Sequence, residues 1–180
     1  AAIGWMVLLA PAALLAALFV RLGSGAPILY SQERQGLHGR AFRIYKFRTM
    51  NDGAEAMDGP QLAQEDDPRI TYVGRFLRRY RLDEIPQLWN VLRGDMSLVG
   101  PRPERPEFAA RFIAENPLYE RRLLVKPGLT GLAQIHGRYD MDYTQKLRYD
   151  LLYLNSASLM ADLRILFATI RTVATGRGAR

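Results

Sequence analysis

The chain has 180 residues, and its 25 lysine and arginine residues against 18 aspartate and glutamate residues give a formal net charge of +7. This length suffices for one domain with a hydrophobic core, and the absence of cysteine excludes disulfides and thiolate metal sites. Of the basic residues 22 are arginine, whose planar fork of donors favours a phosphate-bearing partner. A GC-rich genome that prefers arginine codons would give the same composition.

The first 20 residues carry no charge, and Arg21 is the first charged side chain. About 20 apolar residues match the hydrocarbon thickness that a helix must cross, so this segment is a membrane helix candidate. A signal peptide is the alternative, and it would need a basic segment ahead of the apolar run. The charged residues that follow the run are mostly basic, which assigns that side to the cytoplasm by the positive-inside rule.

Pro11 lies at the middle of the apolar run, where its ring removes a backbone donor and clashes with the preceding turn. A kinked helix that spans the membrane would tolerate it, and so would a helix-break-helix that enters and leaves by one face. Each half of the broken form would have about ten residues and rise ~15 Å, which reaches the middle of the bilayer. We therefore expect residues 1–22 to form a Pro-broken re-entrant membrane helix, and residues 23–180 to form a domain at the cytoplasmic face.

Two short strands are predicted over residues 27–32 and 41–50, joined by a glycine-containing turn, and an acidic loop is predicted over residues 51–69. The strand period of two puts Lys46 and Arg48 on one face, about 6.5 Å apart along the strand. Two cations at that spacing can straddle a pyrophosphate, or they can protect an edge strand from pairing with another chain.

Residues 70–82 predict a basic amphipathic helix. Such a helix is typical of a membrane surface, although a core helix with a solvated basic face has the same pattern. Its apolar stripe consists of Val73, Phe76, Leu77 and Tyr80, and its basic residues are Arg75, Arg78, Arg79 and Arg81.

Residues 83–95 predict a second helix, in which Pro86 suits the first turn and Gly94 the C-terminal end. Asp83 then lies at or near the N-cap, where a capping side chain contributes about 1 kcal/mol. A cap explains Asp83 but not its neighbour Glu84. At a helix N-terminus both carboxylates can reach one ligand, and the electropositive end would keep Asp83 ionised.

In the following segment, Pro101 and Pro103 flank Arg102 and predict a stiff loop that holds its guanidinium at low entropic cost, although a plain Pro-rich connector is equally consistent. Residues 125–140 predict a Pro-Gly turn, a short strand and a Gly-Arg turn. The predicted fold class is therefore α+β: a mainly helical, membrane-associated single domain with a small β-hairpin and an N-terminal re-entrant helix.

The order of these segments resembles one family, the bacterial monotopic phosphoglycosyl transferases. The likeness runs through the Pro-broken apolar helix, "QERQG", "KFRTM", "RLDEIPQLWNVLRGDMSLVGPRPE", "KPGLTGLAQIHGR" and a C-terminal helix over residues 158–173, "SLMADLRILFATIRTV". The segments "DGPQLAQEDDPRIT" and "KLRYDLLYL" are most similar to the longer members, such as undecaprenyl-phosphate galactose or glucose phosphotransferases.

The resemblance implies a ping-pong transfer of sugar-1-phosphate from a UDP-sugar to polyprenol phosphate at the cytoplasmic face of the bacterial inner membrane. Asp83 would be the nucleophile that forms a phosphosugar intermediate and releases UMP, with Glu84 beside it in the catalytic site. Either carboxylate would hold Mg²⁺ together with substrate oxygens. Substrate phosphate would be bound by Lys46, Arg48, Arg81, Arg102 and Arg138. The product would begin the assembly of a polysaccharide or glycoconjugate, such as exopolysaccharide, capsule or O-antigen.

Two other readings of the residues stay open at this point. A non-enzymatic module could bind anionic lipid through its arginine-rich helix. A nucleic-acid binder is favoured only by charge and explains neither the apolar segment nor the carboxylate pair, so we expect no nucleic-acid partner. Assembly into a homo-oligomer is also left open.

Overall fold

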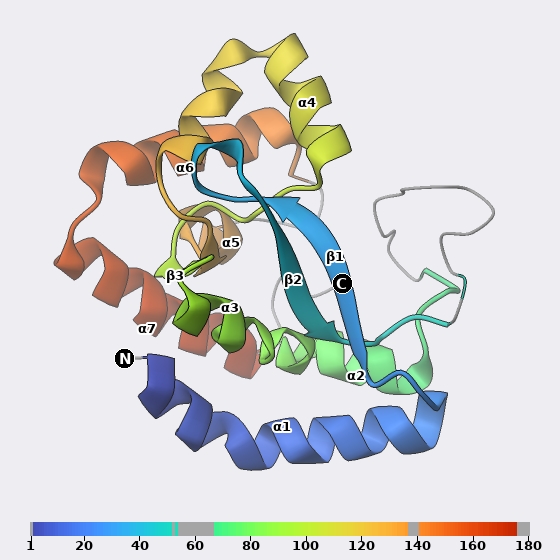
Figure 1. Ribbon diagram of the computed structural model, residues 1–180. Coiled ribbons are helices and arrows are strands. Elements are labelled where there is room, and N and C mark those ends of the chain that lie inside the picture. Colours follow the sequence, from blue (N-terminus) through green and yellow to red (C-terminus); the bar gives the residue numbers. More distant parts are fainter. Residues whose placement is uncertain (1, 52, 54–66, 137–140, 176–180) are drawn as a thin grey trace.

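The computed structural model describes residues 2–51, 53, 67–136 and 141–175 (Figure 1). The helices are α1 (Ala2–Ser24), α2 (Tyr72–Arg79), α3 (Gln87–Arg93), α4 (Pro106–Glu115), α5 (Leu132–His136), α6 (Tyr143–Ser156) and α7 (Leu159–Thr175). The strands are β1 (Leu29–Gln35), β2 (Ala41–Phe47), β3 (Ser97–Val99) and β4 (Gly128–Thr130). Three 3₁₀ segments are η1 (Leu37–Gly39), η2 (Leu82–Glu84) and η3 (Pro117–Leu124). The predicted α+β class, mainly helical with a small hairpin, is confirmed.

Helix α1 is continuous across Pro11, so the break expected there is absent, although the helix is curved (Figure 1). The helix also ends two residues later than the predicted end of this segment at residue 22. Its second half packs on the domain through Ala16 and Val20, which are fully buried against Phe47 and Leu77. In the described part of the chain α1 alone is long and apolar enough to cross a membrane, and only 11% of its apolar window is buried.

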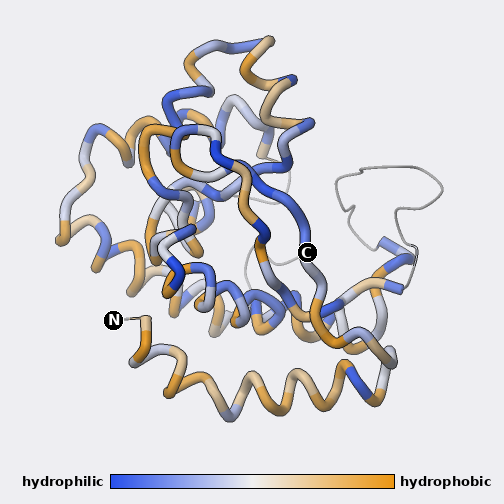
Figure 2. Tube along the Cα trace, viewed as in Figure 1, coloured by the Kyte–Doolittle hydropathy of each residue, from blue (hydrophilic) through white to orange (hydrophobic). Residues whose placement is uncertain are grey.

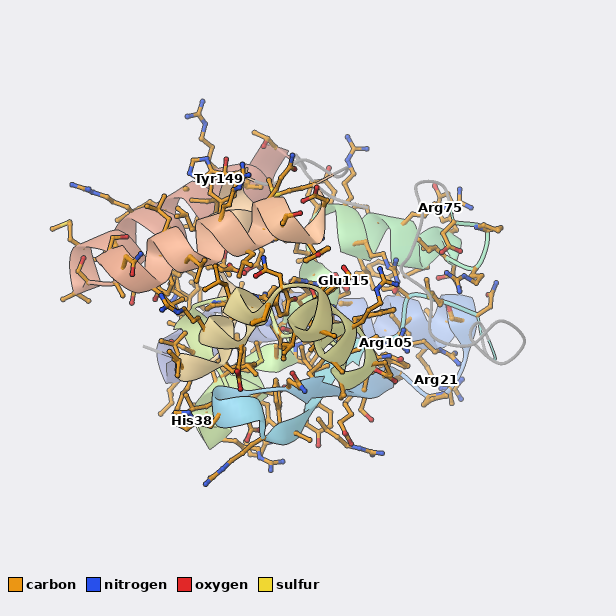
Figure 3. The ribbon with its side chains drawn as sticks, turned by 90° about the horizontal axis from the view of Figure 1, so that it is seen from above. Arg21, His38, Arg75, Arg105, Glu115 and Tyr149 are labelled. Carbon is orange, nitrogen blue, oxygen red and sulfur yellow. The ribbon has the colours of Figure 1, made fainter. Side chains whose placement is uncertain are left out.

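The predicted hairpin is present, but its first strand is shifted toward the turn and its second strand ends at Phe47 rather than at residue 50. Strand β1 pairs antiparallel with β2 from Leu29 opposite Phe47 to Gln35 opposite Ala41. The turn between them carries His38, which lies far from Arg21 at the end of α1 (Figure 3). Most of the predicted acidic loop, residues 51–69, lies outside the described residues, apart from a short stretch at each end.

The two predicted helices over residues 70–95 are shorter than expected, and they are separated by η2. Helix α2 begins where the Thr71 side chain accepts a hydrogen bond from the Gly74 amide (3.0 Å), and α3 ends at Gly94, which has a left-handed φ of 84°. The expectation that Asp83 caps the second helix is wrong, because the residue before α3 is Pro86 and Asp83 lies inside η2. The N–H groups of Glu84, Ile85 and Leu88 each bond the carbonyl three residues back, so the chain runs through 3₁₀ turns here and the regular helix begins only at Gln87.

A second pair of strands, β3 and β4, is parallel and joins distant parts of the chain. Their pairing was not predicted from the sequence. Ser97 lies opposite Gly128, and Val99 lies opposite Thr130. The two backbones approach so closely that a Cβ on Gly128 would lie 2.1 Å from the Gly100 nitrogen. Glycine is therefore required at this crossing, which fixes the start of the loop that carries Arg102.

The C-terminal elements form the remaining core. Helices α4 and α6 pack with η3 around an aromatic cluster in which Phe112 stacks on Tyr143 with ring centroids 4.4 Å apart. Helix α7, predicted over residues 158–173, is confirmed with nearly the same bounds and packs through Ile165 on Val99 and Tyr153. This half of the chain supports the β3 and β4 strands, and so supports the loop that follows β3.

Candidate active site

Glu84 lies at the centre of a cluster of charged side chains from three elements. Its Oε1 atom accepts hydrogen bonds from Lys46 Nζ of β2 (3.1 Å) and from Arg102 Nη2 of the loop after β3 (2.7 Å). Burial alone would raise the pKa of the Glu84 carboxyl, but Arg102 and Lys46 outweigh burial and hold that pKa well below its usual range. Glu84 is therefore ionised and fixes both cations.

Asp83 is equally buried but has a different environment. The described residues place no hydrogen-bond donor or ion-pair partner on its carboxylate. Burial, followed by repulsion from Glu84, raises the pKa of Asp83, and Lys46, Arg78 and Arg102 oppose that rise. The expectation that a helix N-terminus keeps Asp83 ionised is thus replaced by a desolvated carboxylate in a basic surrounding. Such a group is available to react.

Two arginines of the α2–η2 segment, Arg78 and Arg81, also interact electrostatically with the carboxylate pair of Asp83 and Glu84. Arg81 has a left-handed backbone (φ 51°), which turns the chain sharply between α2 and η2. Burial lowers the pKa of Arg81, and the charge of Glu84 offsets part of that effect. Arg78 acts electrostatically on Asp83 and donates from Nε to Thr49 Oγ1 (2.8 Å). Its role was not predicted, because helical spacing alone does not show the turn at Arg81.

The structure brings Lys46, Arg81 and Arg102 to the carboxylate pair, but it places the guanidinium of Arg48 elsewhere. Arg48 donates from Nη1 to the Ala26 carbonyl (3.1 Å) and from Nη2 to the Ser24 carbonyl, so it binds the C-terminal end of α1. The phosphate-binding role of Arg48 stays a prediction, and the structure gives it a further, structural contact. Arg138 lies outside the described residues.

The carboxylate pair fits Mg²⁺ only as part of a site that the substrate completes. Within the described residues no group of three or more histidine and acidic side chains could hold a metal ion. Asp83 and Glu84 supply carboxylate oxygens, and the two contacts from Lys46 and Arg102 both fall on Oε1 of Glu84. One or two carboxylates with substrate phosphate oxygens is the set that Mg²⁺ commonly takes, so the residues present are compatible with it.

The site thus places a buried carboxylate pair among lysine and arginine side chains, and the segment that carries the pair packs through Leu82 and Ile85 against the apolar helix α1. The chain belongs to the bacterial sugar transferase family, whose model matches residues 1–176. The family resemblance deduced from the sequence motifs is therefore confirmed.

Curated relatives name the reactions found in this family. The chain is 46% identical over 176 residues to a UDP-N-acetylgalactosamine-undecaprenyl-phosphate N-acetylgalactosaminephosphotransferase from Aeromonas hydrophila, covering 96% of the chain and 41% of the relative. It is 45% identical to a UDP-glucose:undecaprenyl-phosphate glucose-1-phosphate transferase from Caulobacter vibrioides (93% and 64% covered). It is 41% identical to an undecaprenyl-phosphate galactose phosphotransferase from Salmonella typhimurium (86% and 35% covered). The chain thus spans less than two thirds of the length of each of these three.

Proposed function

We propose that the chain transfers a sugar-1-phosphate from a UDP-sugar to undecaprenyl phosphate or a similar polyprenol phosphate, and that it releases UMP. The observation that carries this proposal is the difference in environment between two adjacent buried carboxylates. Glu84 is fixed by Lys46 and Arg102, whereas Asp83 receives no donor from the described residues. The substrates named for the curated relatives agree with this chemistry.

In the first half-reaction, an oxygen of the Asp83 carboxylate attacks the phosphorus next to the sugar. The bond from that phosphorus to the bridging oxygen breaks, UMP leaves with the electron pair, and a glycosyl-phosphoryl-aspartate remains. In the second half-reaction, a phosphate oxygen of the polyprenol phosphate attacks the same phosphorus. The acyl phosphate bond breaks, the polyprenol-diphosphate-sugar is released, and Asp83 returns to its carboxylate form.

The cations of the site neutralise and orient phosphate, which is the main task in phosphoryl transfer. Lys46 and Arg102 are both anchored on one oxygen of Glu84, so their positive charges are in place before the substrate binds. The Arg102 side chain is still 41% exposed, which leaves donors free to reach a diphosphate. Arg81 adds positive charge to the same surrounding. When bound between Asp83 or Glu84 and the substrate, Mg²⁺ would supply charge neutralisation of the diphosphate.

Helix α1 accounts for access to the lipid substrate in this proposal. Most of its residues are hydrophobic (Figure 2), and Arg21 in its last turn is its single charged residue. The exposed large apolar side chains of α1 are Ile3, Val7, Leu8, Leu14, Leu15, Leu18, Phe19 and Leu22. Burial of this surface in a bilayer would be strongly favourable, since each exposed leucine-sized side chain contributes about 1.5–3 kcal/mol. A re-entrant path with both ends at the cytoplasmic face is part of this proposal, and it rests on the proline within this apolar helix.

The decisive experiment follows UMP release and labelling of the protein. The purified protein is incubated with Mg²⁺ and UDP-glucose, UDP-galactose or UDP-N-acetylgalactosamine, first without and then with undecaprenyl phosphate. We expect up to one UMP per chain and a phosphosugar on the peptide that contains Asp83 in the first case, and repeated turnover in the second. Asp83→Asn abolishes both signals. Asp142→Asn, at the exposed N-cap of α6, is the matched control and keeps both.

Two results would count against the proposal. A label that persists in Asp83→Asn, or that maps to another peptide, would remove Asp83 as the nucleophile. Absence of UMP release with every donor, in a protein that still partitions into anionic vesicles, would favour the non-enzymatic membrane-surface module instead.

A further inference from the structure

The loop from Pro101 to Glu104 is held from outside at every carbonyl. The four carbonyl oxygens of residues 101, 102, 103 and 104 accept hydrogen bonds, in that order, from the Gly128 amide (2.9 Å), Arg122 Nη2 (2.8 Å), Arg34 Nη1 (3.2 Å) and the Gln35 amide (2.9 Å). Pro101 and Pro103 also restrict the backbone on both sides of Arg102. Four successive bonds of this kind leave the loop little freedom, so the direction of the Arg102 side chain depends on the groups that bind the loop carbonyls.

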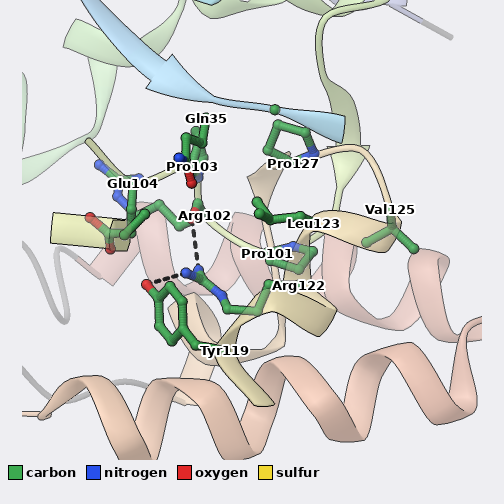
Figure 4. A pocket seen from close by; sticks show the side chains of 12 residues that line it. Gln35, Pro101, Arg102, Pro103, Glu104, Tyr119, Arg122, Leu123, Val125 and Pro127 are labelled. Atoms are coloured by element: carbon green, nitrogen blue, oxygen red, sulfur yellow. Dashed lines mark hydrogen bonds between the residues drawn. The ribbon is translucent and has the colours of Figure 1, made fainter. Parts of the chain in front are cut away.

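The donor at Arg102 itself differs from the other three, because it belongs to a buried ion pair. Arg122 donates from Nε to Asp150 Oδ2 of α6 (2.6 Å). It also donates from Nη1 to the Tyr119 hydroxyl and from Nη2 to the Arg102 carbonyl (Figure 4). The side chains of Arg122 and Asp150 are only 7% and 3% exposed. The planar guanidinium therefore binds three partners at once in a fixed orientation.

We propose that Arg122, oriented by Asp150, is a positioning residue for the phosphate-binding guanidinium of Arg102, and this rests on the function proposed above. The chain of contacts runs from Asp150 to Arg122, to the Arg102 carbonyl, and through the Arg102 side chain to Glu84. A buried pair with a solely structural role would stabilise the fold without any dependence on Arg102. A positioning pair acts on catalysis only through Arg102.

The test is a double-mutant cycle between residues 122 and 102. Arg122→Lys keeps a positive charge beside Asp150 but cannot bind Asp150, Tyr119 and the Arg102 carbonyl in one plane. We expect Arg122→Lys to lower kcat about tenfold in the wild-type background, with a smaller change in KM for the UDP-sugar. In the Arg102→Ala background the same change should have almost no further effect, because the group that it positions is gone.

Leu147→Ala is the matched control for loss of stability. Leu147 is buried one turn before Asp150 on α6 and makes no hydrogen bond to Arg122. Its truncation should lower Tm as much as Arg122→Lys does, and should change kcat by the same small factor in both backgrounds. If Arg122→Lys does not fold, Asp150→Asn, which removes the countercharge and preserves side-chain volume, takes its place in the cycle.

The outcomes separate the two proposals. Equal losses of kcat from Arg122→Lys with and without Arg102, or no loss in the wild-type background, would overturn the positioning role while the proposed reaction stands. A wild-type protein that releases no UMP from any UDP-sugar would overturn the proposed function, and the positioning role with it. Loss of kcat confined to the background that contains Arg102 supports both.

Discussion

The molecule buries carboxylates against arginine in two regions, and the two regions differ in how far they are closed. In the C-terminal half, Arg122 and Asp150 are almost fully covered, at 7% and 3% exposed. In the η2 region, Glu84 is 10% exposed, but Arg102, which binds it, is 41% exposed. A closed pair cannot exchange its partners without unfolding, whereas an open pair can share its cation with an incoming anion.

Within the η2 region, the adjacent carboxylates of Asp83 and Glu84 also differ in their environment. The pKa of Glu84 is held far down by Arg102 and Lys46 against the effect of burial, whereas burial raises the pKa of Asp83. Adjacent residues on a 3₁₀ turn point in different directions, so Glu84 accepts hydrogen bonds from Lys46 and Arg102, whereas Asp83 feels these cations only through their charge. One carboxylate thus organises the cations, and its neighbour stays available for reaction.

The largest effect is expected from the cations that bind Glu84 in the more exposed region. Lys46→Ala or Arg102→Ala should lower kcat/KM by about 10², because each removes a preorganised cation from the phosphate site. Partitioning into membranes should stay unchanged in both variants. The measurement is steady-state UMP release beside a vesicle co-sedimentation assay. Activity that survives while the protein leaves the membrane fraction would show that these residues act on lipid instead.

Arg48→Ala is the contrasting variant for that experiment. Its guanidinium binds the carbonyls of Ser24 and Ala26 at the end of α1, so we expect its loss to lower Tm and to weaken the attachment of that helix. A loss of kcat/KM with an unchanged Tm would instead support the phosphate-binding role predicted from the sequence.

A smaller effect is expected in the pH dependence of the first half-reaction. The ionised form of Asp83 is the nucleophile, and its raised pKa places the acid limb of UMP release above the range of an ordinary aspartate, about 3.9. Lys46 lowers this pKa, so Lys46→Met should move the acid limb to still higher pH. Arg111→Met, in an exposed ion pair on α4, is the control and should leave the limb in place. A limb that moves to lower pH in Lys46→Met would contradict the assignment to Asp83.

Local patterns in the sequence predicted local structure well. The hairpin follows from two short strand patterns joined by a glycine-containing turn, the apolar helix follows from an uncharged run of 20 residues, and Gly94 ends its helix as expected. The C-terminal helix was expected from the family resemblance. The misplaced Asp83 also has a local cause. The pattern did not reveal that Arg81 takes a left-handed conformation or that the chain continues in 3₁₀ turns past Pro86, and these two features move Asp83 from a cap into η2.

Contacts between distant segments could not be predicted in the same way. The pairing of Ser97–Val99 with Gly128–Thr130 and the reach of Arg122 from η3 to the Arg102 carbonyl connect residues 20 or more positions apart. A single sequence has no periodic signal for such contacts. Local patterns had singled out the carboxylate pair, Lys46 and Arg102 one segment at a time. The family resemblance then implied that they share one site, because a motif resemblance carries information on long-range proximity.

The smallest predicted effect concerns stability, and it tests the difference between the two neighbouring carboxylates. A carboxyl with a raised pKa binds its proton more tightly in the folded chain, so its ionised form costs stability above that pKa, and the cost disappears as the pH falls. At neutral pH, Asp83→Asn removes this cost and should leave Tm unchanged or raise it. Glu84 has a depressed pKa, so it contributes stability above its unfolded pKa, and this is lost as the pH falls through the folded value.

Glu84→Gln is therefore expected to have the opposite sign. At neutral pH it leaves Lys46 and Arg102 without their shared countercharge and should lower Tm by about 3 °C, the shift that ~1 kcal/mol produces in a domain of this size. Thermal unfolding of both variants at pH 7 and again at acidic pH measures the difference, which should shrink as Glu84 becomes protonated in the wild type. A lower Tm for Asp83→Asn than for Glu84→Gln at pH 7 would mean that Asp83, rather than Glu84, holds the cations together.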